Sequence, residues 1–163
     1  MSRAMVPALF LLLLVAATAS AGPNAGGTLV VHDVGLDASC DEALPDPTEC
    51  SQIDNEVPAG PPALCPYYYW RVYAAFPEGS SPRLKSLCLG AAFDPTVAVL
   101  AGGLIDPIND FEITEGGWPT VSGGGAGIGF GAVQTGVLTP CYWFAGYSYD
   151  VEQTGLWTIV PHP

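Results

Sequence analysis

Aromatic side chains spaced to share one face are the strongest candidates for binding chemistry in this chain. The segment Tyr67 to Phe76 reads Y-Y-Y-W-R-V-Y-A-A-F, and alternate residues of an extended strand point to opposite sides. With Trp118 in a Gly-Gly-Trp-Pro turn, the outward side forms a candidate ligand-binding platform for a sugar ring or a partner protein. The alternative is a strand buried on both faces, with a cation–π contact between its arginine and the rings. The outward side carries Tyr67, Tyr69, Arg71 and Tyr73, and the inward side carries Tyr68, Trp70, Val72, Ala74 and Phe76.

A second group of candidates is rich in oxygen ligands. Asp106, Asn109, Asp110 and Glu112 offer the hard oxygen donors that calcium prefers, although the spacing of an EF-hand is absent. We therefore expect no cofactor other than a structural calcium ion at these four positions. The carboxylates of this segment, with Glu115, form a glycosidase pair only if the fold sets two of them across a cleft. A solvated acidic loop is the alternative.

Nucleophilic catalysis lacks a recognisable set of residues. His32 is the only histidine away from the C-terminus, and no G-x-S-x-G turn presents a serine. Because His32 ends a β-branched run and precedes Asp33, it is typical of a hydrogen-bonded residue at a strand end. We predict no catalytic residue. The alternative, a secreted hydrolase acting on carbohydrate or peptide, requires His32 or the carboxylates of 106–115 to line a cleft.

The first twenty-one residues have the layout of a cleavable export signal. Arg3 supplies a positive charge, an apolar stretch follows from Leu9 to Ala17, and Ala19-Ser20-Ala21 is a small-residue cleavage site before Gly22. This stretch is too short to anchor a protein in a membrane. We expect a mature chain that begins near Gly22, has no membrane span, and is secreted to the periplasm, the cell surface or the medium.

Five cysteines in an exported chain predict disulfide bonds with one thiol left over. Cys40 and Cys50 flank a short loop rich in Pro, Asp and Glu, whereas Cys88 and Cys141 each lie in an apolar, strand-like run. Spacing alone does not define the connectivity. We predict the bridges Cys40–Cys50 and Cys88–Cys141, with Cys65 as the free thiol.

Charge and hydropathy narrow the class of partner. The chain carries sixteen acidic residues against four basic ones, for a formal net charge of −12 at pH 7. Such a chain is repelled by nucleic acid and by anionic membrane surfaces. Because 49% of the residues are hydrophobic and only 12% are charged, the chain is not a disordered acidic tail. We expect an unidentified protein or glycan as the partner.

Short strands separated by Gly- and Pro-rich turns predict an all-β fold. No window after the signal keeps a helical period, and the pattern is typical of a single antiparallel β-sandwich or jelly roll of about seven to nine strands over residues 22–163. Residues 33–66 form a long, acidic, Pro-rich loop in this interpretation, and Asp106-Pro107 and Gly116-Gly117-Trp118-Pro119 mark further turns. The expected strands are 28–32, 67–76, 84–93, 97–104, 122–131, 139–149 and 156–160.

Alternating glycines distinguish one expected strand. In 122–131 every second residue from Gly123 to Gly131 is glycine, and Ile128 and Phe130 fall on the other side. Since glycine weakens a strand, a bare face indicates close approach by a ring or a backbone. We predict that Tyr142, Trp143 or a ring of the 67–73 run lies across it, so that Gly127→Val destabilises the fold.

Two patches resemble known secreted proteins. Residues 87–100, centred on Phe93-Asp94-Pro95-Thr96, resemble the aromatic-Asp-Pro strand-turn of cohesin-like bacterial domains. Segments including Gly26–Leu29, Ala74–Lys85, Gly117–Pro119, Tyr142–Tyr147 and Pro161–Pro163 resemble a set of secreted bacterial β-sandwich proteins without an assigned function. The resemblance implies a sandwich fold and a non-catalytic role, and it transfers no site residues. We therefore expect a secreted module with a structural, cell-surface or ligand-binding role.

Overall fold

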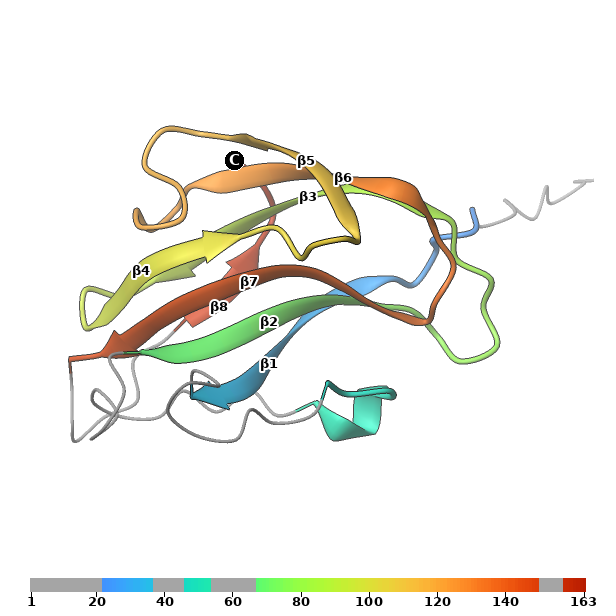
Figure 1. Ribbon diagram of the computed structural model, residues 1–163, viewed down its shortest axis with the longest axis horizontal. Helices are drawn as coiled ribbons and strands as arrows, with labels where there is room; N and C mark the ends of the chain where they lie inside the picture. Colours follow the sequence, from blue (N-terminus) through green and yellow to red (C-terminus); the bar gives the residue numbers. More distant parts are fainter. Residues whose placement is uncertain (1–21, 37–45, 54–66, 150–156) are drawn as a thin grey trace, which may run out of the picture.

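The computed structural model describes residues 22–36, 46–53, 67–149 and 157–163 (Figure 1). Within these ranges the chain forms eight strands and one short 3₁₀ turn, η1 (Cys50–Gln52). No helix in the described ranges is long and apolar enough to cross a membrane. The strands are β1 (Thr28–Leu36), β2 (Tyr68–Ala75), β3 (Leu84–Phe93), β4 (Val97–Gly103), β5 (Asn109–Thr114), β6 (Gly125–Gln134), β7 (Leu138–Ser148) and β8 (Trp157–Val160).

The strands form a β-sandwich of two antiparallel sheets, which confirms the predicted fold class. The first sheet has the order β1-β2-β7-β4 and the second has the order β5-β6-β3-β8. Figure 1 shows the two sheets stacked with their strands running along the long axis of the molecule. Each sheet is apolar on its inner face, so stacking removes both apolar faces from water.

The core between the sheets is dominated by aromatic rings. Trp70 of β2 stacks on Trp157 of β8 with ring centroids 5.8 Å apart, and Phe144 of β7 meets Trp157 edge-on at 5.0 Å. These contacts join strands of opposite sheets, and ring pairs of this kind stabilise a core beyond the area they bury. A smaller cluster fills one end of the sandwich; it consists of Ala74, Phe76, Leu84, Phe130 and Cys141.

Strand β2 follows the predicted alternation from Tyr69 to Val72, whereas Tyr73, which was predicted on the outward side, is buried as well. The inward residues Trp70, Val72 and Ala74 are 1%, 0% and 4% exposed, as the period of two requires. Tyr69 and Arg71 lie on the outer face of the first sheet, where their register partners on β7 are Ala145 and Trp143. The local pattern of β2 therefore positions the outward rings.

The glycine-rich segment forms strand β6 with its glycines on one face, as predicted, but a different ring covers that face. Ala126, Ile128 and Phe130 are buried, so the glycines lie on the outer face of the second sheet. The ring of Phe111 from β5 lies over Gly129, where a Cβ would stand 2.5 Å from its Cδ1. The prediction that Tyr142 or Trp143 covers this face is wrong, because Tyr142 points into the core and Trp143 lies against Gly103.

The pairing of strands also changes two boundaries expected from the sequence. β1 runs past Asp33 to Leu36, because it pairs with β2 along that whole length with one bulge between Asp33 and Gly35. β5 forms where only turns were expected, because residues 109–114 pair with β6. The predicted signal and most of the predicted 33–66 loop lie outside the described residues.

Candidate functional site

Aromatic side chains gather on the outer face of the first sheet, over β2 and β7. Tyr69 and Trp143 lie with ring centroids 5.9 Å apart at an interplanar angle of 36°, and Tyr147 meets Tyr149 edge-on at 4.9 Å. Tyr147 shares the outward direction of Trp143, since Tyr142 and Phe144 point inward. We call Tyr67, Tyr69, Trp143, Tyr147 and Tyr149 the aromatic face. Tyr149 is 63% exposed and the other four are partly exposed, so part of each side chain faces solvent.

Hydroxyl groups tie part of the aromatic face together. A hydrogen bond with Tyr149 raises the pKa of the Tyr147 hydroxyl, and the charge that Tyr67 would carry raises the same pKa further. These three tyrosines are therefore neighbours. The raised pKa keeps the Tyr147 hydroxyl protonated at neutral pH, so it remains able to donate a hydrogen bond.

Arg71 and Tyr73 do not extend this surface, contrary to the predicted platform. The Asp46 carboxylate accepts hydrogen bonds from the Arg71 guanidinium and from the Tyr73 hydroxyl, the latter at 2.7 Å. Tyr73 is only 2% exposed, and burial followed by the bond to Asp46 raises its pKa. The two side chains therefore hold segment 46–53 against the sheet.

Trp118 is also absent from the aromatic face. Its ring lies 5.6 Å from Tyr142 and 5.4 Å from Phe144, which are both core residues of β7. The indole N–H donates to the Tyr142 hydroxyl at 2.8 Å and to Glu112 Oε1 at 3.1 Å, and the Tyr142 hydroxyl donates to the same carboxylate oxygen at 2.7 Å. Burial and the bond to Glu112 raise the pKa of Tyr142. Trp118 thus belongs to a polar triangle that joins the two sheets.

The predicted calcium ligands are used separately. Glu112 points inward to the triangle, Asn109 Oδ1 accepts the backbone N–H of Ile105 at 2.6 Å, and Asp106 and Asp110 are exposed. Strand formation spreads Asn109, Asp110 and Glu112 along β5, and Asp106 lies in the turn before this strand, so the four are not curled around an ion. In the described ranges, no three acidic, His or Cys side chains gather as a metal site.

The arrangement required by the hydrolase alternative is not seen at His32. This residue is 4% exposed and lies edge-on to the Tyr73 ring at 6.3 Å. Glu112 is tied to Tyr142 and Trp118, while Asp106, Asp110 and Glu115 are exposed. Neither of the two cavities described below has His32 or one of these carboxylates in its lining.

The predicted bridge Cys88–Cys141 is wrong. Cys88 of β3 is exposed, because its neighbours Leu87 and Leu89 take the inward positions of the second sheet. Cys141 of β7 is fully buried in the first sheet, where its thiol donates to the Thr139 carbonyl at 3.1 Å. Burial raises the pKa of Cys141 to about 12.

The other cysteine predictions concern two residues outside the described ranges. Cys50 is exposed with a free thiol, while its predicted partner Cys40 lies outside the described residues. Cys65, the predicted free thiol, also lies outside the described residues.

Comparison with models of protein families, with curated proteins and with solved structures gives no significant match.

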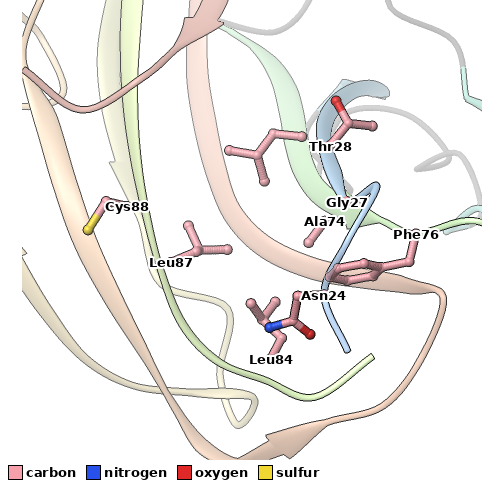
Figure 2. Close-up of a pocket in the computed structure, with 9 residues that line it drawn as sticks. Asn24, Gly27, Thr28, Ala74, Phe76, Leu84, Leu87 and Cys88 are labelled. Atoms are coloured by element: carbon pink, nitrogen blue, oxygen red, sulfur yellow. The ribbon is translucent and has the colours of Figure 1, made fainter. Parts of the chain in front are cut away.

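A cleft lies along the side of the sandwich where β1 faces β3 (Figure 2). Its volume is about 240 Å³. Figure 2 shows Leu84 and Leu87 on β3, Ala74 and Phe76 across the cleft from them, and Asn24 beside Leu84. A second cavity, of about 300 Å³, continues along the same side between β1 and β8. The sequence pattern did not predict these two cavities, because their position depends on where β8 ends along β3.

Proposed function

We propose that this protein is a secreted, non-catalytic β-sandwich module that binds carbohydrate on its aromatic face. The observation that carries the proposal is the cluster of four tyrosines and one tryptophan on the outer surface of the first sheet. The export-signal layout of the first twenty-one residues supports secretion.

The chemistry of the aromatic face suits a sugar better than a charged ligand. The C–H groups of a sugar ring pack on the negative face of an aromatic ring, and tyrosine hydroxyls donate and accept hydrogen bonds at its rim. The tilted pair Tyr69–Trp143 and the edge-on pair Tyr147–Tyr149 present rings in different orientations. Two stacking positions on one face favour an oligosaccharide over a single sugar.

Binding is tested by affinity electrophoresis in gels that contain single soluble polysaccharides, such as xylan, mixed-linkage β-glucan or galactomannan. We expect at least one polysaccharide to retard the wild type, and we expect Tyr149→Ala to reduce the retardation at least fivefold, because Tyr149 is the most exposed ring. Phe111→Ala is the matched control, since Phe111 is 51% exposed on the opposite sheet.

Two results contradict the proposal. Retardation that is equal in wild type and Tyr149→Ala across all polysaccharides, or absent throughout, removes the aromatic face as a sugar site. Release of reducing sugar from a retarding polysaccharide shows that the module is catalytic and favours the hydrolase alternative.

A further inference from the structure

One edge of the second sheet is incomplete along half its length. β8 pairs with β3 only from Gly90 to Phe93. Pro161 follows β8 and cannot donate to the ladder, and the chain then turns so that His162 and Pro163 lie against Gly125. On the side away from β6, no strand in the described part of the chain pairs with Leu84–Leu89 of β3.

At the other end of this open edge, the Asn24 side chain makes the hydrogen bonds that a neighbouring strand would make. The Asn24 carboxamide donates to the Arg83 carbonyl at 3.2 Å and accepts the Arg83 N–H at 2.8 Å. A neighbouring strand makes the same two bonds with its peptide group. The gap between Asn24 and β8 therefore spans Leu84 to Leu89, which is the usual length of one strand.

The floor of the gap is apolar. The cleft of about 240 Å³ runs between β1 and this stretch of β3, and its lining includes Leu29, Ala74, Phe76, Leu84 and Leu87. A strand added beside β3 directs every second side chain toward this floor. Only a polypeptide can satisfy the backbone groups of the edge and fill the apolar floor at the same time.

Charge around the gap selects the kind of peptide. Arg83 and Lys85 stand at the start of β3, and they are two of the four Lys and Arg residues in a chain of net charge −12. Lys85 Nζ is held by the carbonyl oxygens of Phe130 and Gly131, the latter at 2.9 Å, so its positive charge is not neutralised by a carboxylate at that contact. Because these carbonyl oxygens belong to β6, on the other side of β3, the Lys85 charge lies away from the gap. Arg83, which directly precedes β3 and is exposed, is the basic residue at the end of the gap, and it favours an acidic residue of a peptide there.

We infer that the cleft between β1 and β3 binds an extended peptide, which adds a strand to the second sheet along Leu84–Leu89. The peptide carries aliphatic or aromatic residues at alternate positions and an acidic residue near Arg83. This site is on a different surface from the aromatic face and does not depend on the proposed sugar binding.

The site is tested by selecting a phage library of random octapeptides on the immobilised wild type. Thr28→Trp serves as the blocking variant, because Thr28 lines the cleft and is exposed, so a large side chain there obstructs the cleft without entering the core. Thr114→Trp is the matched control on an exposed strand position of β5. We expect sequences with an acidic residue and alternating apolar residues, bound at least tenfold more weakly by Thr28→Trp and unchanged by Thr114→Trp.

Hydrogen exchange locates the bound peptide. A synthetic copy of the most enriched sequence should slow exchange at Leu84–Leu89 and leave β5 unchanged. The inference is overturned if no sequence is enriched, if Thr28→Trp binds as well as wild type, or if protection falls elsewhere. Concentration-dependent dimers that Thr28→Trp abolishes, with no enriched peptide, assign the cleft to a second copy of the chain and also overturn it.

Discussion

Gly146 is the position in β7 where a single methyl group should do the most damage. A Cβ built there overlaps the carbonyl oxygen of Ala98 and lies 3.1 Å from the Cα of Val99. Both obstructing groups belong to the backbone of β4, which pairs with β7 through a bulge between Val99 and Ala101. Neither can rotate away as a side chain would, so the strands must separate to admit the methyl group.

The expected cost of Gly146→Ala follows from overpacking a buried contact. Forcing an extra carbon into a packed interior costs about 1–3 kcal/mol, and a backbone obstruction belongs near the upper end of that range. For a domain of this size, we expect the melting temperature to fall by about 6–10 °C. The matched variant is Gly127→Ala, because a Cβ at Gly127 meets Cys88 Sγ at 3.7 Å and the Ile113 carbonyl oxygen at 3.9 Å, which are ordinary contacts.

Urea unfolding followed by tryptophan fluorescence measures the difference. Gly127→Ala should unfold at the same or a higher urea concentration than wild type, since replacing a strand glycine gains up to about 1 kcal/mol. The sequence predicted that a larger side chain at Gly127 destabilises the fold. We no longer expect this, because the Phe111 ring lies over Gly129 and not over Gly127. Equal midpoints for Gly146→Ala and wild type would refute the argument from backbone obstruction.

Two further predictions concern the outer face of the second sheet and the buried thiol. Gly129→Ala should destabilise the fold by about 1 kcal/mol, less than Gly146→Ala, because the obstructing Phe111 ring is 51% exposed and can move aside. In a Phe111→Ala background, thermal melts should show that the same change is neutral or stabilising. An equal loss of stability in both backgrounds would disprove the ring contact. The pKa of Cys141 is about 12 in the folded chain against an ordinary value of 9.0, so its contribution to stability is complete below pH 9 and is lost as pH rises toward 12. Urea midpoints between pH 8 and 11 should therefore fall less steeply for Cys141→Ala than for wild type, and parallel slopes would contradict the assignment.

The inward residues Trp70, Val72 and Ala74 of β2 could be predicted from sequence because alternate residues of an extended segment share a face. The burial of Tyr73 could not, because its partner Asp46 comes from a distant segment of the chain. β5 was missed, although Phe111 and Ile113 alternate with Asp110 and Glu112, because the segment is short, acidic and next to an Asp-Pro turn. A segment of that kind becomes a strand only when a neighbour supplies hydrogen bonds, and here β6 does so.

Side-chain partners across the two sheets were the hardest to predict. The same period-two argument that orients β2 would have placed Cys88 outside, since Leu87 and Leu89 flank it. Cys141 lies at an irregularity in the pairing of β2 with β7, between the partners Val72–Tyr142 and Tyr73–Pro140, which local pattern does not reveal. Trp118 was predicted on the outer platform for a related reason. A tryptophan in a turn can point outward or inward, and the hydrogen-bond partners that hold its ring inward, Tyr142 and Glu112, come from two different strands.

The triangle of Glu112, Tyr142 and Trp118 has a consequence for the edge of the sandwich. Among the described strands, β5 is at the edge of the second sheet and pairs with β6. Edge strands are the elements most easily peeled away or exchanged between copies. Because one carboxylate oxygen of β5 is shared by a hydroxyl from the opposite sheet and an indole from the following loop, β5 cannot leave unless both bonds break together. The triangle thus opposes strand exchange, and its opening would expose the buried Tyr142 hydroxyl together with the half-buried Glu112 carboxylate and Trp118 indole.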